Sequence, residues 1–199
     1  MIDVLPRPAT VTPPVDPAPL ADWTRRIRAG DLSAFEALFR ALHAPLVRFA
    51  RTYTPRPEAA DDVVQEAFAR LWERRDRLDP ERSVRALLFQ AVRNRALNAS
   101  RDRRTREDLL QQHAEAPASG PLLPDDLAHG ETLGAHLRRC LDALPDRQRE
   151  ALTLTRLDGL SHAEAADIMG CAARTVNNHI VRGLHTLRER LHAFDPDAF

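Results

Sequence analysis

The chain has 199 residues, enough for one large domain or two small ones, and its 29 basic residues balance 29 acidic ones, so net charge favours neither a nucleic-acid-binding nor a membrane-surface protein. Its two cysteines, Cys140 and Cys171, lie far apart without metal-ligand spacing, which argues against a disulfide framework or a zinc ribbon and fits a reducing cytoplasm. No apolar run approaches the ~18 residues of a membrane span, and the N-terminus lacks the pattern of a signal peptide, so we expect a cytoplasmic protein that does not insert into a membrane.

The chain begins with a tail that is followed by a helical domain. Residues 1–22 contain six prolines and no periodic apolar face, which indicates a disordered tail. From residue 23 to residue 106, apolar residues recur three and four apart, as in "FEALFRALHAPLVRFA", and strand-like alternation is nowhere sustained. We therefore expect a first, all-helical domain over residues 23–106.

The helix expected over residues 58–75 has one acidic and one apolar face. On a helical wheel, Gln65, Glu66 and Glu73 lie within about 60° of Asp62. The opposite face carries apolar side chains, those of Val64, Ala67, Phe68 and Leu71. The pattern by itself is that of an amphipathic helix with solvated carboxylates. No histidine or second carboxylate cluster accompanies these acids, so we expect no catalysis, no bound metal and no cofactor.

A local surplus of positive charge follows in "RNRALNASRDRRTR", residues 93–106, which has six arginines and one aspartate. Residues 107–134 then read as an acidic linker, with six acidic residues, no arginine and the loop-like run "APASGPLLPDD". A charge run is usually a solvated helix face, but this separation of signs gives the first domain a phosphate-seeking surface. Asn94 and Asn98 share a face from which their amides could contact a nucleic acid.

Helical periodicity resumes over residues 135–192 and predicts a second all-helical domain, ahead of a short tail at 193–199. Ser161 and Glu164 have the spacing of a capping box, which starts a short helix, and Gly170 permits a left-handed turn at the end of that helix. These signals are typical of a helix-turn-helix.

The second helix of this unit is expected from Arg174 to Leu191, and the small Ala166 would let the two helices cross closely. Its buried stripe consists of Val176, Ile180, Leu184, Leu187 and Leu191. Its opposite face presents Arg174, Asn178, Arg182 and His185. Guanidinium and amide groups suit guanine and adenine edges, so this face favours DNA binding over a plain pair of core helices.

Three blocks in this order carry a family resemblance: "DDVVQEAFARLW", "LLFQAVRNRALNASR" and "LPDRQREALTLTRLDGLSHAEAADIMGCAARTVNNHIVRGLHTLRERL". The chain resembles a sigma factor of the extracytoplasmic-function (ECF) group over residues 22–191. The resemblance implies a first domain that binds the clamp helices of core RNA polymerase and opens the minus-ten promoter element. It implies a second domain, which meets the polymerase flap and reads the minus-thirty-five element.

The same resemblance implies roles for particular residues. The polymerase-binding set is Asp61, Asp62, Gln65 and Glu66. The minus-ten set is Arg93, Asn94, Asn98, Arg101, Arg103 and Arg104. The minus-thirty-five set is Arg174, Thr175, Asn177, Asn178 and Arg182. "VRNRALN" and "TVNNHI" are closest to sigma factors that pair with a membrane-anchored anti-sigma factor.

The sequence departs from the family pattern at two positions, and two other functions are alternatives to this interpretation. Ala172 stands where the family often has a capping serine or threonine, at a cost of about 1 kcal/mol of helix capping, and the family often has a tryptophan near Leu87. A LuxR-type helix-turn-helix regulator would also suit the C-terminal segment, but nothing before residue 135 indicates its α/β receiver. A helical metal-binding adaptor using His136 and Cys140 would lack further ligands.

Overall fold

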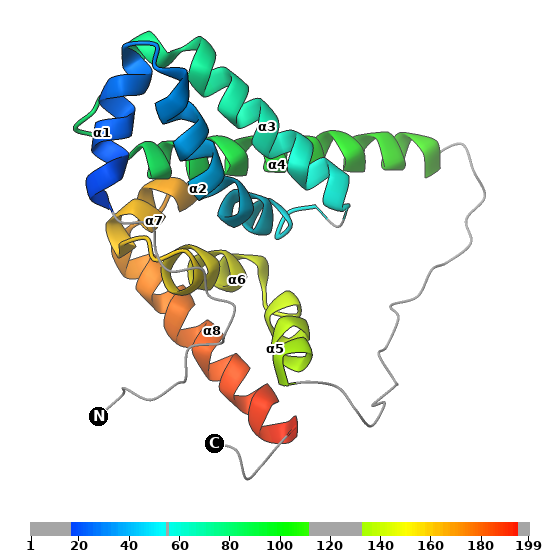
Figure 1. The fold of residues 1–199 in the computed structure, drawn as a ribbon. Helices are drawn as coiled ribbons and strands as arrows, with labels where there is room; N and C mark the ends of the chain where they lie inside the picture. The colour runs from blue at the N-terminus through cyan, green and yellow to red at the C-terminus, as the bar shows by residue number, and fades with distance from the viewer. Residues whose placement is uncertain (1–16, 55, 112–132, 195–199) are drawn as a thin grey trace.

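The computed structural model describes residues 17–54, 56–111 and 133–194, and every regular element in these residues is helical (Figure 1). In chain order the elements are α1 (Pro17–Arg28), α2 (Leu32–Ala50), α3 (Pro57–Glu73), the 3₁₀ turn η1 (Arg75–Arg77), α4 (Val84–Gln111), α5 (Leu133–Asp142), α6 (Asp146–Leu152), the π-helical turn η2 (Thr153–Leu157), α7 (His162–Met169) and α8 (Ala173–Phe194). The expected all-α class is confirmed.

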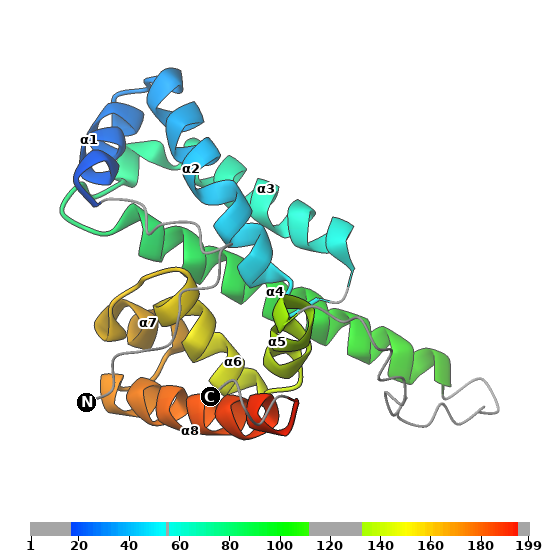
Figure 2. The same ribbon diagram turned by 60° about the horizontal axis from the view of Figure 1, so that its bottom comes forward.

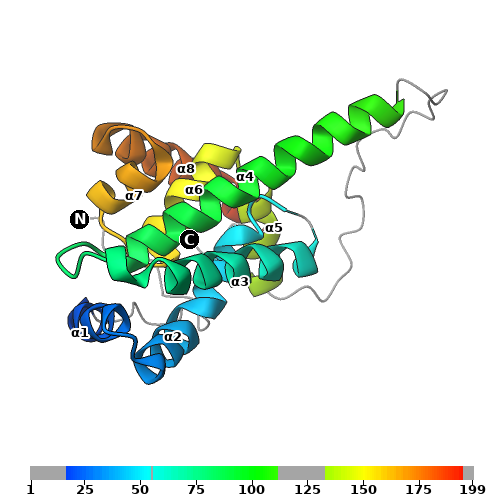
Figure 3. The same cartoon turned by 90° about the horizontal axis from the view of Figure 1, so that it is seen from above.

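Helix α4 separates two groups of helices. Figure 2 shows α1, α2 and α3 on one side of it and α5 to α8 on the other. Helix α2 packs on both α1 and α3, and all three of these helices contact α4. Helix α8 packs against α5, α6 and α7, and α7 reaches across to contact α4. The C-terminal part of α4 projects beyond both groups (Figure 3). The two expected helical units therefore lie directly against each other.

The first group is built around aromatic side chains supplied by amphipathic helices. Phe49 of α2 and Phe89 of α4 pack with ring centroids 5.1 Å apart, and Phe39 lies 4.8 Å from Phe68 of α3. Asp31 starts α2 by accepting hydrogen bonds from the first free backbone N–H groups of that helix. Edge and tilted ring contacts of this kind add to the burial of apolar surface, and they hold both α3 and α4 against α2.

The expectation of a disordered tail over residues 1–22 is wrong from Pro17 onward, where α1 begins. Proline is tolerated in the first turn of a helix, because its missing N–H would have no partner there. Leu20 and Ile27 are buried, and the Thr24 hydroxyl donates to the carbonyl of Leu20 at 2.7 Å. Tertiary packing thus overrides the local proline signal. The remaining residues of the expected tail, 1–16, lie outside the described residues.

The expected linker, residues 107–134, is shortened at both ends. Helix α4 continues to Gln111 and α5 begins at Leu133, because good helix formers follow the arginine-rich segment without a proline or glycine to stop it. The stretch from 112 to 132 lies outside the described residues. At the other end of the second unit, α8 extends to Phe194, beyond the expected boundary at 192.

The helix-turn-helix signals are confirmed in detail. Ser161 and Glu164 form a reciprocal capping box at the start of α7, and Gly170 ends the helix with φ +63° in the left-handed region. The expected apolar stripe of α8 is buried at Val176, Ile180, Leu187 and Leu191 and half-buried at Leu184. Local sequence therefore determines the turn and the rotation of α8.

Gly183, on α8, marks a close helix crossing that sequence reasoning had missed. A Cβ at Gly183 would lie 2.8 Å from Leu152 Cδ1 and 3.4 Å from Gln148 Cβ, so only a residue without a side chain lets α6 approach this closely. We expect Gly183→Ile to lower the free energy of unfolding by about 1–3 kcal/mol, because its branches would displace both neighbours. Gly183→Ala should cost less, since the end of Leu152 can rotate and alanine favours a helix by about 1 kcal/mol.

Thermal unfolding of the two Gly183 variants beside the wild type checks this expectation. An isoleucine variant as stable as the wild type would show that α6 and α8 do not pack at this distance.

Candidate nucleic-acid interface

The exposed face of α8 gathers four of its five predicted DNA-contacting residues. Arg174, Asn177, Asn178 and Arg182 are exposed, and Ala172 directly precedes the helix. Thr175 is half-buried, and its backbone N–H donates to Ala172 O at 2.8 Å. The helix therefore offers guanidinium and amide donors over its first turns, where a recognition helix enters a major groove.

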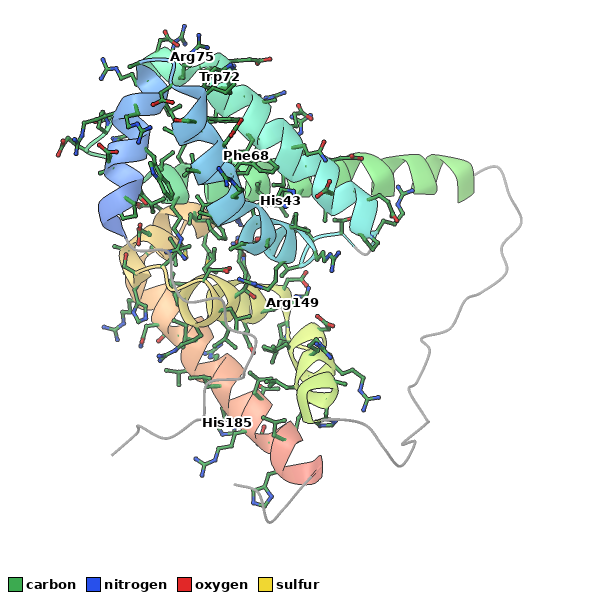
Figure 4. All side chains as sticks on the ribbon, in the orientation of Figure 1. His43, Phe68, Trp72, Arg75, Arg149 and His185 are labelled. Atoms are coloured by element: carbon green, nitrogen blue, oxygen red, sulfur yellow. The ribbon has the colours of Figure 1, made fainter. Side chains whose placement is uncertain are left out.

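Val181 is an exposed apolar residue on the same face that sequence reasoning missed. Its side chain is 58% exposed, and it lies seven residues after Arg174, or about two helical turns. His185 follows one turn later, pairs with Glu189 at 3.3 Å and points away from the helix bundle (Figure 4). An apolar group among polar ones is able to contact a thymine methyl in a major groove. The helical wheel that placed Arg174 and Asn178 on this face could also have found Val181.

The predicted minus-ten residues on α4 differ in their exposure to solvent. Asn94, Asn98 and Arg101 are exposed. Arg103 and Arg104 belong to the last turns of α4, but their side chains lie outside the described ones. The amides of Asn94 and Asn98 therefore share the exposed face expected of them.

Arg93, by contrast, turns toward the C-terminal helices. Its side chain is only 12% exposed, and its Nε pairs with the buried carboxylate of Glu150 on α6. The use of Arg93 for DNA binding stays a prediction, and it requires the two helical groups to move apart.

The acidic face of α3 is partly engaged within the protein. Asp61 pairs with His43 Nε2 at 3.0 Å and accepts a hydrogen bond from Gln65 at 2.5 Å. Asp62 is exposed, and none of the ion pairs found among the described residues involves it. Figure 4 shows His43 beside this face, on α2.

Glu66 is the most heavily engaged acid of this face. It pairs with Arg70 of the same helix at 3.1 Å and with Arg95 of α4. It therefore helps to bind α3 to α4, whereas Asp62 is open to a partner.

A groove of about 910 Å³ runs between α3 and α4 and joins the two predicted surfaces. Asp62 and Glu66 lie on its α3 side, and Asn94 and Asn98 lie on its α4 side. Leu87, 46% exposed, lines the same groove and therefore belongs to this surface and not to the core.

Comparison with known proteins identifies the family. The family described as "Sigma-70 region 2" matches residues 38–106 of this chain, and the family described as "Sigma-70, region 4" matches residues 135–187. An RNA polymerase sigma-E factor of Streptomyces coelicolor is 31% identical over 169 residues, covering 85% of this chain and 92% of that protein. The ECF RNA polymerase sigma-E factor of Escherichia coli K12 is 30% identical over 174 residues, covering 83% and 91%. The chain belongs to the ECF group of sigma factors.

Two solved structures are similar to this sigma factor over most of its length. CnrH, solved in complex with the cytosolic domain of CnrY, matches with a TM-score of 0.63 and 26% identity over 88% of this chain and 98% of CnrH. The sigma factor RpoE of Bartonella quintana, solved in complex with the anti-sigma factor NepR, matches with a TM-score of 0.61 and 25% identity over 79% and 96%.

The function follows from the family. The sigma factor binds core RNA polymerase and directs promoter-specific initiation of transcription, and it is not itself an enzyme. The region 2 match occupies the place where a LuxR-type regulator would carry its receiver, which argues against that rival function. From here on, region 2 denotes α1 to α4 and region 4 denotes α5 to α8.

The metal-adaptor alternative finds no support in the described part of the chain. His136 Nε2 lies 3.4 Å from Cys140 Sγ, and Cys140 is buried, as expected of a cysteine in a helical core. Within the described ranges no group of three or more potential metal ligands occurs. None of the described helices combines the length and apolar character needed to cross a membrane.

Sequence reasoning missed the acids of this sigma factor that lie where regions 2 and 4 meet. Glu150 and Asp158 are 3% and 2% exposed. The turn η2 carries Asp158 inward, with its backbone N–H donating to Thr153 O at 2.9 Å in the i to i−5 pattern of a π-helix. Glu150 precedes the buried Leu154 by one helical turn, and an isolated acid on an apolar face was the signal that could have found it.

Proposed function

We propose that region 4 of this sigma factor reads the minus-thirty-five element through the exposed face of α8. The observation that carries this proposal is the grouping of Arg174, Asn177, Asn178 and Arg182 on one solvent-facing side of a helix whose other side is buried. These side chains supply the donors that discriminate guanine and adenine edges. Thr175 is half-buried at the helix start, where its hydroxyl would contact backbone phosphate.

We propose further that region 2 joins the polymerase and the minus-ten element along the groove between α3 and α4. Asp62, with Asp61, Gln65 and Glu66 around it, would meet the clamp helices. Asn94 and Asn98 on the opposite side would contact the minus-ten bases, with Arg101, Arg103 and Arg104 on the phosphates. The groove supports this proposal, because acids of the polymerase-binding set line one side of it and amides of the minus-ten set line the other.

We infer that the protein works in the cytoplasm and is held inactive there by an anti-sigma factor of the membrane-anchored kind. The support is by analogy. RpoE of Bartonella quintana was solved with the anti-sigma factor NepR, and CnrH was solved with the cytosolic domain of CnrY.

Reconstituted transcription with core polymerase on a promoter library tests the assignment of the two surfaces. The enriched promoters should share one element near minus ten and another near minus thirty-five. Enrichment of a minus-ten element alone would contradict the proposal that α8 reads a minus-thirty-five element.

On the enriched promoter, Asn94→Ala and Asn98→Ala should each weaken minus-ten recognition by about 1–3 kcal/mol, as expected for loss of an amide contact to a base edge. Permanganate reactivity of unpaired thymines measures the opening of the element. Gln90→Ala is the matched control, because Gln90 is an exposed amide on the same helix that does not line the groove. Equal losses in all three variants would contradict the assignment of Asn94 and Asn98.

A further inference from the structure

A second hollow of this sigma factor adjoins the groove between α3 and α4. It has a volume of about 300 Å³ and lies where the turn between α1 and α2 meets the end of α3 and η1. Its lining residues are Arg28, Ala29, Gly30, Glu73, Arg75 and Asp76. Arg74 and Arg77, from the same short segment of chain, line the groove instead. The segment at η1 therefore borders both spaces.

Arg75 forms a flat surface beside this hollow. Its guanidinium lies over the indole of Trp72, with Cζ 4.6 Å from the ring centroid, and its Nη1 donates to Trp72 O at 2.9 Å. Trp72 in turn packs on Phe35 of α2 at a centroid distance of 5.0 Å. Arg75 is only half-buried, so its guanidinium is held in place and still reaches solvent. Unpaired nucleic-acid bases stack on guanidinium planes as they do on aromatic rings.

Two charged side chains without partners also face the hollow. None of the ion pairs and side-chain hydrogen bonds found in the described part of the chain involves Arg28 or Glu73, although both residues line the same space. An exposed cation can pair with a backbone phosphate, and a carboxylate accepts hydrogen bonds from the amino group of a base. Asp76 is less available, because Arg77 pairs with it at 4.0 Å. The hollow thus combines a stacking surface, a cation and a hydrogen-bond acceptor.

The length of the groove leads a promoter strand to this hollow. Along α4 the groove is lined from Leu87 to Ala99, a span of about 18 Å at about 1.5 Å per residue. Stacked nucleotides follow one another at roughly 3.4 Å along a strand, so about five of them fill the groove. A strand that continues past the end formed by Arg74 and Arg77 next meets the hollow.

We propose that this hollow binds one unpaired base of the promoter strand directly beyond the minus-ten element, stacked on Arg75 and with its amino group donating to Glu73. Arg28 contacts the adjoining phosphate. The inference rests on the proposed binding of the minus-ten strand in the groove, and it adds a base position outside that element. Cytosine, adenine and guanine carry an amino group and thymine does not, so the site disfavours thymine.

The hollow is separate from the other surfaces of the protein. Figure 4 shows Arg75 and Trp72 at the end of region 2 remote from Arg149 of α6, so the packing of region 4 on α4 does not cover them. Asp62, which is proposed to meet the polymerase, precedes Glu73 by about three helical turns. A strand can therefore enter the hollow while polymerase occupies the start of α3.

The test uses holoenzyme reconstituted from the full chain and core polymerase, with fluorescent single strands as probes. One strand carries only the minus-ten sequence enriched from the promoter library, and two others extend it by three cytosines at the 5′ or the 3′ end. We expect one of the two extensions to raise affinity about five- to tenfold, as one stacked base does. Arg75→Ala should lose this gain and bind the unextended strand as tightly as the wild type.

Further variants separate stacking from charge. Arg75→Lys keeps the positive charge without the guanidinium plane and should lose the gain as Arg75→Ala does. Glu73→Gln should bind cytosine and thymine extensions alike, because an amide both donates and accepts hydrogen bonds. Arg28→Ala should reduce the gain. Arg25→Ala is its matched control, because Arg25 is exposed on the same helix and does not line the hollow, and it should keep the full gain.

The unextended strand reports binding in the groove, so failure of the hollow and failure of the minus-ten contact are measured separately, and thermal melts show whether each variant is folded. No gain from either extension in the wild type, or a gain retained by Arg75→Ala, overturns the base site. A full gain in Arg75→Lys overturns stacking and assigns the effect to charge alone. Equal binding of the unextended strand and a scrambled strand contradicts the groove, and the base site with it.

Discussion

Alanine in place of Arg174 or Asn178 is expected to relax the base preference of this sigma factor within the minus-thirty-five element. Both side chains are exposed near the start of α8. A guanidinium or amide that bonds a base edge contributes about 1–3 kcal/mol of discrimination against the wrong base. Each variant should therefore lose about fivefold to 150-fold in transcription from the preferred promoter, and much less from promoters already changed at the contacted base pair.

Arg182 provides the comparison within the same helix. It lies one turn beyond Asn178, further from the helix start that enters the groove, and we expect it to contact phosphate. Arg182→Ala should weaken binding to all sequences alike and reduce the salt dependence. The measurement is transcription by reconstituted holoenzyme on promoters that differ only in the minus-thirty-five element. An unchanged base preference in both Arg174→Ala and Asn178→Ala would remove α8 as the reader.

Reversal of charge at Asp62 is expected to abolish capture of core RNA polymerase while leaving the fold intact. Asp62 is exposed on α3, and no described ion pair engages it, so Asp62→Lys should change the free energy of unfolding by only about 0.5 kcal/mol. A lysine facing the clamp helices would replace attraction by repulsion of like charges. Pull-down of core polymerase measures binding, and a thermal melt checks the fold.

Two further variants make the Asp62 result specific. Asp76→Lys reverses an exposed acid beyond the end of α3 and should leave polymerase capture unchanged. Glu66→Lys should lose binding and also lower the melting temperature, because it places a third cation beside Arg70 and Arg95. Normal capture by Asp62→Lys would exclude this face from the polymerase contact.

The sequence by itself determined the features that depend on near neighbours. The capping box of Ser161 and Glu164, the left-handed turn at Gly170 and the buried stripe of α8 all involve residues within a few turns of one another, so periodicity and capping rules were sufficient. The order of the three sequence blocks gave the family, which the region 2 and region 4 matches confirm.

Only the tertiary structure decided the features that depend on distant partners. Leu20 and Ile27 make α1 a helix despite its prolines, because burial against the rest of region 2 outweighs a weak local preference. Gly183 has meaning only once α6 lies against it. No helical period relates Arg93 to Glu150, 57 residues away, or Arg48 to Asp158, 110 residues away. These pairs form only where packing of whole helices brings an arginine and an acid together and excludes water, which is also why sequence reasoning put Arg93 on DNA and the structure puts it on Glu150.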